Sequence, residues 1–456
     1  MTTNKLIARI SAHLFLTLIP IPDGADSRKR ASGRSHWLKR LAMMCCIVNS
    51  VSADTFGLFT YTEYTDRITI TGYPTTAVGS VVIPTSINGK PVTSIGGGAF
   101  WECSKISSVS IPTAVTSIGN TAFYGCESMV TINIPAGVTT ISFQAFFECR
   151  SLTSITIPSA VISIQDYAFY GCSGLTKIVI PPSVRGIYDY AFYGCWRLSS
   201  VEIPSTVVIL ETFVFAECWN LINVILHPGI TSIPTSFFYG CWRLKTVTIP
   251  SSVTTIGNSA FADCVGLTAI TIPSAVKSIW SRAFSSCANL KNAIFLGDAP
   301  AFGAYVFADV SPDFAILYLS GKQGFSSPSW NGYPAVDMGG SPDIPIWLIS
   351  NGIPYDADLQ SDANNDGVNL LMAYALGLNP LENLSAKIPV PVFSANQMRY
   401  TYYSGRTGIT YRVESSIDLI SWSTNGVQVS PPNANKFKTA TIDMMGNRRF
   451  MRLVVE

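Results

Sequence analysis

The chain has 456 residues, of which 48% are hydrophobic and 13% are charged, and its formal net charge is +2. This charge is too small to predict a nucleic acid as a partner. No run of about 20 uninterrupted apolar residues occurs, so no membrane span is predicted. Low charge with abundant Thr, Ser, Gly and aromatic residues favours a secreted, β-rich protein of two or three domains.

The first 53 residues have the layout of a secretory leader. The segment RSHWLKRLAMMCCIVNSVSA (34–53) has a basic start, an apolar run from Leu41 to Val48 and small residues up to Ala53. We therefore predict a signal peptide in residues 1–53, with cleavage after Ala53. Its unusual length indicates either an extended leader or a start codon assigned too early.

A repeat of 23 residues follows. Nine cysteines are spaced at this interval, and a phenylalanine lies three residues before each of them. A fixed period in this range predicts a solenoid, in which each coil buries its apolar face against its neighbours. The nine cysteines are Cys103, Cys126, Cys149, Cys172, Cys195, Cys218, Cys241, Cys264 and Cys287.

Each repeat predicts one strand and one turn. LTSITIP (152–158) alternates as a strand does, and Pro158 ends the hydrogen-bond ladder because it has no N–H. SIQDYAFYGC (163–172) predicts a turn with one possible helical turn. We expect an N-terminal cap and first coil at 54–94, nine repeats at 95–296, and a degenerate tenth coil with a C-terminal cap at 297–338. The first coil carries five extra residues.

IPSSVTTIGNSAFADCVGLTAITIP (249–273) resembles the BspA-like, treponemal-type leucine-rich repeats of bacterial surface and secreted proteins. The resemblance implies a leucine-rich-repeat solenoid with a parallel β-sheet on one face and turns or short helices on the other. It further implies adhesion or protein binding and a secreted or cell-surface location in a bacterium, and it does not imply an enzymatic activity.

The repeated cysteines have two interpretations. A thiol at one place in all nine coils is most simply a small buried group stacked into a structural ladder, since free cysteine is among the most buried residue types. A reactive or zinc-binding thiol is the alternative, but clustered C-x-x-C pairs are lacking in the sequence.

Aromatic residues repeat in two further positions and are the candidate binding residues. Trp196, Trp219 and Trp242 directly follow a cysteine in three consecutive coils, and Arg197 and Arg243 follow two of them. Tyr193 and Tyr239 lie two residues before a cysteine. Trp and Arg are typical of binding hot spots, but the same residues could instead pack over the turns and stiffen them.

The C-terminal quarter of the chain differs in composition. We expect a linker at 339–345, a helical segment at 346–385 and a small antiparallel β domain at 386–456, with hairpin turns at 404–408 and 445–447. In the helical segment, Asp362, Asn364 and Asp366 occupy three positions of a calcium loop, although Ala373 replaces its last ligand. Ca²⁺ at 362–367 and a plain Asx-rich turn both remain open, and no other cofactor is predicted. The whole segment resembles C-terminal modules of bacterial exported proteins.

These features predict an exported, non-enzymatic binding protein whose solenoid recognises an extracellular protein or glycan. Two alternatives remain. One is a secreted hydrolase with acidic residues on the sheet face or in the C-terminal domain, which the scarcity of histidine disfavours. The other is a passive structural spacer, which predicts no exposed aromatic strip.

Overall fold

The computed structural model describes residues 54–339, 343–351, 353, 357–394, 397–406, 409–417, 419–443 and 450–456. The predicted leader (1–53) therefore lies outside the described residues. Within the described ranges, no helix is both long enough and apolar enough to cross a bilayer.

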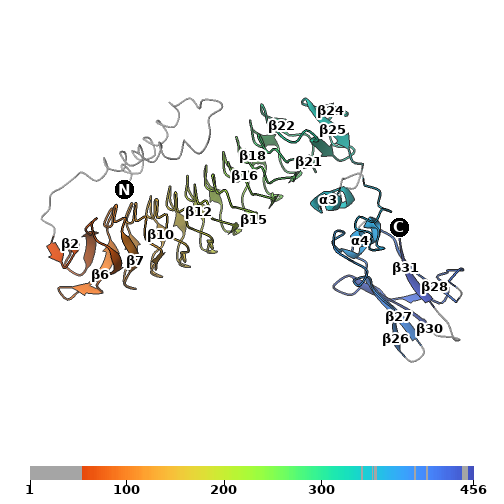
Figure 1. Cartoon of the computed structure of the whole chain (residues 1–456), viewed down its shortest axis with the longest axis horizontal. Coiled ribbons are helices and arrows are strands. Elements are labelled where there is room, and N and C mark those ends of the chain that lie inside the picture. Colours follow the sequence, from red (N-terminus) through yellow and green to blue (C-terminus); the bar gives the residue numbers. More distant parts are fainter. Residues whose placement is uncertain are drawn as a thin grey trace. The chain divides into compact units, whose positions relative to one another are not determined.

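Successive coils of the repeat stack into a parallel β-solenoid, as the repeat predicts (Figure 1). Residues 23 apart pair in register, for example Ser200 with Asn223 and Asn223 with Thr246. A single parallel bridge between Ser154 and Lys177 joins the coils where no longer strand forms. The strands of this face are β4 (Gly79–Val82), β7 (Ile106–Ser110), β9 (Thr131–Ile132), β13 (Ser200–Ile203), β15 (Asn223–Leu226), β17 (Thr246–Thr248), β19 (Ala269–Ile272), β21 (Asn292–Phe295) and β23 (Ala315–Tyr318).

A second parallel ladder, which the sequence analysis did not anticipate, runs through the Ser/Thr–Ile pairs of each coil. In-register pairs such as Ser163 with Gly186 and Ile164 with Ile187 form it. The second residue of most pairs is an isoleucine that points into the core and is buried, such as Ile164 and Ile187, whereas Ile209 in β14 is exposed. Its strands are β6 (Lys90–Ile95), β8 (Ser117–Ile118), β10 (Thr140–Ile141), β11 (Ser163–Ile164), β12 (Gly186–Ile187), β14 (Ile209–Leu210), β16 (Ser232–Ile233), β18 (Thr255–Ile256), β20 (Ser278–Ile279) and β22 (Ala301–Phe302).

The segment before each cysteine is a turn and contains no α-helix in any described coil. Two of its residues adopt the left-handed conformation in every coil. The residue before each cysteine has φ between +53° and +70°, and the fifth residue before it has φ between +51° and +68°. Left-handed residues interrupt a right-handed helix, so the helical turn considered for 163–172 does not form. Most of these positions hold side chains other than glycine, including Glu148 and Tyr167.

Antiparallel hairpins close both ends of the solenoid. At the N-terminal end, β2 (Phe59–Glu63) pairs with β1 (Asp54–Phe56) and β3 (Ile68–Gly72), and β3 runs parallel to β6. The five extra residues of the first coil form a hairpin between β5 (Ser86–Ile87) and β6. Its turn residues Asn88 and Gly89 have φ of 51° and 76°, as a two-residue hairpin turn requires. At the other end, β24 (Ser329–Trp330) pairs with β25 (Tyr333–Asp337).

Two short helices begin the C-terminal module. Helix α3 (Asp343–Ser350) begins inside the stretch expected to be linker. Pro345 lies in its first turn, where a proline is compatible with a helix because the N–H groups of this turn have no partner within the helix. Helix α4 (Leu370–Leu376) is capped by Asn369, whose side chain accepts the N–H of Met372. It ends at Gly377, where φ is 70° and the N–H bonds back to carbonyls of the last turn.

The β domain consists of two antiparallel sheets around a small apolar core. One contains β26 (Val392–Ser394), β27 (Gln397–Tyr403), β30 (Phe437–Asp443) and β29 (Gln428–Val429). The other pairs β28 (Tyr411–Ser416) with β31 (Phe450–Val455). The hairpins predicted at 404–408 and 445–447 were wrong, because β27 pairs with β30 and β28 pairs with β31, so that strands adjacent in sequence belong to different sheets. This arrangement buries Met398, Tyr400 and Tyr402 against Val413 and Leu453. Residues 407–408 and 445–447 of the turns themselves lie outside the described residues.

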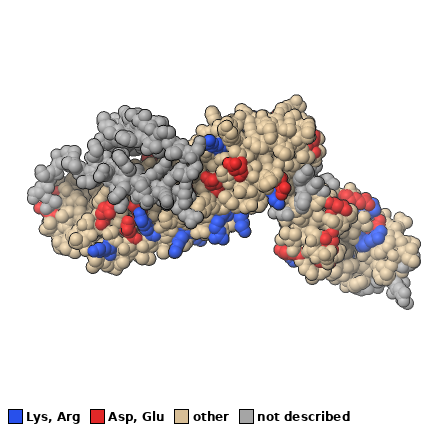
Figure 2. Space-filling model, turned by 45° about the horizontal axis from the view of Figure 1, so that its top comes forward, with Lys and Arg blue, Asp and Glu red and all other residues tan. Residues whose placement is uncertain are grey.

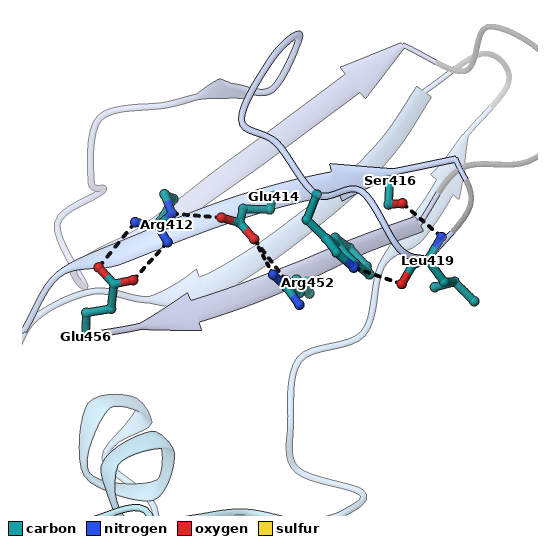
Figure 3. A network of polar contacts seen from close by, with 7 residues as sticks. Arg412, Glu414, Ser416, Leu419, Arg452 and Glu456 are labelled. Carbon is teal, nitrogen blue, oxygen red and sulfur yellow. Dashed lines mark hydrogen bonds and ion pairs between the residues drawn. The ribbon is translucent and has the colours of Figure 1, made fainter.

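An ion-pair network covers the β28–β31 ladder (Figure 3). Glu414 lies opposite Arg452 in register, and its Oε2 accepts a hydrogen bond from Nη2 of that arginine at 2.7 Å. Its Oε1 accepts Nε of Arg412 at 3.0 Å, and Arg412 also binds Glu456. The hydrogen bonds from both arginines lower the pKa of Glu414, and that from Arg452 has the larger effect.

Candidate functional site

The three tryptophans of consecutive coils form one continuous ring stack. The centroids of Trp196 and Trp219 are 4.8 Å apart with planes inclined by 2°, and those of Trp219 and Trp242 are 5.0 Å apart at 5°. The in-register stacking of the coils places these identical side chains one above the next. We call Trp196, Trp219, Trp242 and the adjacent arginines the aromatic strip.

Stacking covers both faces of Trp219 and one face each of Trp196 and Trp242, so the central ring presents its edge to solvent. Trp196 is 38% exposed, and the other two indoles are half-buried. Arg197 and Arg243 are exposed beside them. Nη1 of Arg243 donates to Oδ1 of Asn220 in the preceding coil at 3.0 Å, which places this guanidinium along the strip.

Residues at the left-handed position before each cysteine hold the indoles in place. Nε1 of Trp219 donates to Oε2 of Glu217 at 2.6 Å. A Cβ on Gly240 would lie 3.1 Å from the carboxyl carbon of Glu217, so glycine leaves room there for that carboxylate. A Cβ on Gly194 would lie 3.6 Å from Nε1 of Trp196, which shows that this indole folds back over its own turn.

The two tyrosines have different surroundings. Tyr193 ends a second stack, since its centroid is 4.9 Å from that of Tyr170 with planes 5° apart. That stack begins at Trp101 and passes through two buried rings, so it stiffens the turns more than it exposes a surface. Tyr239 is half-buried and hydrogen bonds to Asp263 of the next coil. Burial raises the pKa of Asp263, and the bonds from Tyr239 and Ser286 oppose that shift.

The nine repeated cysteines are all free and fully buried. From Cys126 onward, each thiol donates to the carbonyl oxygen of the phenylalanine 26 residues earlier, at 3.1 to 3.4 Å. Cys103 is the first of the row, and its sulfur lies 3.6 Å from the carbonyls of Tyr73 and Pro74. Each thiol therefore links its coil to the preceding one.

Burial makes these thiols poor nucleophiles. It raises the pKa of Cys103 to about 11 and that of Cys287 to about 12. The pKa of Cys195 is also raised well above its ordinary value, mainly by burial. Because the thiolate is the reactive and metal-binding form, this arrangement suits structure and not catalysis.

The candidate calcium loop is organised by its own backbone. Oδ1 of Asp362 accepts the N–H groups of Asn364 and Asp366 at 3.3 and 3.2 Å, and its Oδ2 accepts that of Gly367 at 2.7 Å. Asp366 accepts N–H groups of Val368 and Leu384, which lower its pKa, Leu384 most strongly. Asn364 donates to Asp366 and to the carbonyl of Glu382. These are the bonds of an Asx-rich turn.

Two polar groups were missed in the sequence analysis. Nε2 of His227 lies 2.7 Å from Oε1 of Glu202 at the margin of the strand face, because the coils stack in register. Asp166, Asp189 and Glu211 have carboxylate oxygens within 4.8 Å of one another. The 23-residue step between the two aspartates could have signalled this cluster. Asp166 accepts the N–H of Asp189, and Asp189 accepts the N–H of Thr212, so these carboxylates cap successive turns.

Comparisons with known proteins agree with this architecture. Residues 93–212 and 185–312 match the family described as BspA type leucine rich repeat region. No curated protein sequence matches the chain.

Similar solved structures include the T. pallidum leucine-rich repeat protein TpLRR, at 33% identity over 42% of this chain and 91% of that one, with a TM-score of 0.39. The pneumococcal vaccine antigen PcpA is 21% identical over 59% of this chain and 82% of that one, with a TM-score of 0.45. A leucine-rich cell surface protein from Faecalibacterium prausnitzii is 24% identical over 63% and 98%, with a TM-score of 0.32. The family match, the 23-residue coils and the parallel ladders together identify the chain as a BspA-type leucine-rich repeat protein.

Proposed function

We propose that the protein is an exported, non-enzymatic binding protein, and that the aromatic strip on its solenoid recognises an extracellular protein or glycan. The observation that supports this most is the exposed edge of the Trp196–Trp219–Trp242 stack, flanked by two exposed arginines. Trp and Arg are the side chains most enriched at binding hot spots. A rigid stack also loses little conformational entropy when a partner binds.

The alternative of a hydrolase has little support in the described residues. Glycoside hydrolysis needs two carboxylates facing one cleft. One hollow in the C-terminal module, about 500 Å³, is lined by Trp347, Tyr374, Tyr403, Arg406 and Lys436 among others, with Asp343 as its single carboxylate. A second hollow, about 490 Å³, has no carboxylate in its lining. On the strand face, Glu202 and His227 are both exposed and lie in no described cleft.

The proposal is tested by incubating the purified chain with arrays of glycans and extracellular proteins. Positive ligands are then measured with a variant in which Trp196, Trp219 and Trp242 are all replaced by alanine. We expect a ligand whose affinity falls in this variant and is retained by Trp280→Ala, since Trp280 is exposed elsewhere on the solenoid. Unchanged affinity in the triple variant would move the binding surface to the strand face. Absence of any ligand would favour the passive spacer.

Export forms a separate part of the proposal. It rests on the basic and apolar layout of residues 34–53. Mass spectrometry of the protein from culture medium or cell surface is expected to give an N-terminus near Asp54. An intact N-terminal segment on the mature protein would contradict it.

A further inference from the structure

The small net charge hides a separation of charge around each coil. In the nine coils, the five residues that follow each cysteine include seven cations and one carboxylate, Glu127. The seven residues that precede each cysteine include seven carboxylates and one cation, Arg282. Because the coils stack in register, these segments form a basic and an acidic band along the solenoid. Figure 2 shows basic side chains gathered along one border of the solenoid.

Six of the seven cations are exposed and form no ion pair with any part of the chain that the structure describes. Arg150 is the exception, since it pairs with Glu127 and Glu148 at 3.8 and 3.1 Å. We call the other six the basic row: Lys105, Lys177, Arg197, Arg243, Lys245 and Lys291. Two of its members, Arg197 and Arg243, also belong to the aromatic strip, so the two features share one flank.

The dimensions of the row suit an extended ligand. Lys105 and Lys291 lie eight coils apart, and the strands of adjacent coils are about 4.8 Å apart, which gives a row roughly 38 Å long. No single small anion can contact cations distributed over this length. A linear polyanion lying along the solenoid axis can contact all six.

Two features of this flank argue against the binding of a single-stranded nucleic acid or of an acidic peptide. Single-stranded nucleic acids bind by stacking successive bases on aromatic faces, but here the neighbouring indoles cover both faces of Trp219 and the inner faces of Trp196 and Trp242. Acidic peptides that add as a strand need free main-chain groups. On this flank the backbone N–H groups of Thr176, Ser199 and Lys245 already donate to the preceding coil.

What remains exposed is charge together with hydroxyl and amide side chains, such as Thr153, Thr176, Ser199 and Asn289. The last three donate to carbonyls of the preceding coil, so they offer their side-chain oxygens as acceptors for sugar hydroxyl groups. This combination matches a sugar polymer, whose hydroxyl groups pair with neutral polar side chains and whose acidic groups pair with cations. We propose that the basic row binds a linear anionic polysaccharide bearing carboxylate or sulfate groups. This inference rests on the proposed binding function and specifies its ligand class.

The test measures binding of the full chain to heparin, which carries sulfate groups, and to polygalacturonate, which carries carboxylates only. Neutral dextran, polyglutamate and oligo-dT serve as comparison ligands. Binding to at least one anionic polysaccharide is expected to weaken as salt concentration rises. The variant Lys177→Gln/Arg197→Gln/Lys245→Gln is expected to lose about tenfold in affinity. The matched control Arg185→Gln/Lys277→Gln/Lys322→Gln removes the same charge from other parts of the solenoid and is expected to bind as the parent does.

Three outcomes of this binding experiment would contradict the inference. Equal loss in both triple variants would show that net charge alone attracts the polymer and would overturn the inference. Tighter binding to polyglutamate or oligo-dT than to either polysaccharide would overturn it in favour of an acidic protein or a nucleic acid. If neither polysaccharide binds at low salt but an array ligand binds through the tryptophans, the inference fails while the proposed function stands.

Discussion

The thiol of Cys195 lies 3.4 Å from the carbonyl oxygen of Phe169 in the preceding coil, and the same oxygen accepts the backbone N–H of Cys172. One carbonyl thus joins two coils, and the arrangement recurs from Cys126 to Cys287. A buried carbonyl with two acceptor sites is satisfied by this geometry. The choice of cysteine over alanine at this position is explained by its weak donor as well as by its apolar volume.

Replacing Cys195 by alanine is expected to lower the free energy of unfolding by about 1–2 kcal/mol, because it removes a buried sulfur and one of the two hydrogen bonds to Phe169. Chemical denaturation of both proteins measures the difference. A serine at this position keeps a donor, so Cys195→Ser tests whether the hydrogen bond or the volume matters more.

The raised pKa values predict that the nine thiols of the native protein resist alkylation at mildly alkaline pH and react after denaturation. Counting labelled cysteines by mass spectrometry checks this. Rapid labelling of Cys195 in the native protein would contradict the packed arrangement.

The periodicity predicted the solenoid because it records which side chains face the core. It could not reveal the conformation of the turns. A left-handed residue is signalled in sequence by glycine, as at Gly171 and Gly194, but coils with Glu148 and Glu217 adopt the same conformation. Stacking on neighbouring coils imposes it, and no local signal accompanies it. The hairpin at Asn88–Gly89, in contrast, does have a local signal, since Asn-Gly is the preferred dipeptide of a two-residue hairpin turn.

The candidate site was predicted in part, because the repeat spacing shows which side chains occupy equivalent positions in neighbouring coils. Equal spacing placed Trp196, Trp219 and Trp242 on one line, and the structure brings them into contact. The orientation of the rings depends on contacts such as that of Trp219 with Glu217, which sequence spacing does not encode. The hydrogen-bonding contact between His227 and Glu202 was missed for a similar reason, since the two residues lie 25 positions apart in neighbouring coils.

Trp219→Ala is expected to weaken ligand binding by about 2 kcal/mol or more, the threshold of a hot spot. It removes the central ring, which contacts both Trp196 and Trp242. We also expect a loss of about 2 kcal/mol in the free energy of unfolding, because two stacking contacts and the bond to Glu217 disappear. Calorimetry of binding and of unfolding separates the two effects.

Trp280→Ala is the matched control, since this indole is 52% exposed and lies outside the stack. This substitution is expected to change neither the ligand affinity nor the free energy of unfolding appreciably. If Trp219→Ala lowers stability but leaves affinity unchanged, the stack only stiffens the turns.

The Glu414 network predicts acid sensitivity of the C-terminal module. Its carboxylate has a pKa below the ordinary 4.5 in the folded state, so the stabilisation is present above 4.5 and is lost as the pH falls toward the lower folded value. Thermal melting of the module between pH 6 and pH 2 is expected to show a decline that Glu414→Gln reduces. Asp313→Asn, which changes an exposed carboxylate of the solenoid that has no ion pair among the described residues, is the control. A melting profile that is unchanged by Glu414→Gln would show that other carboxylates govern the decline.

The loop at 362–367 is expected to hold its shape without a metal ion. Three backbone N–H groups already donate hydrogen bonds to the carboxylate of Asp362, and the carboxylate of Asp366 accepts two more. Calcium would have to displace some of these bonds before it could bind. Millimolar calcium or EDTA is therefore expected to leave the melting temperature of the chain unchanged. Asp362→Ala, in contrast, is expected to cost about 1 kcal/mol under both conditions, because the N–H groups of Asn364 and Gly367 lose their acceptor, while that of Asp366 keeps Oδ1 of Asn364. A calcium-dependent rise in melting temperature that Asp362→Ala abolishes would establish a metal site here, since a plain Asx-rich turn has no dependence on the ion.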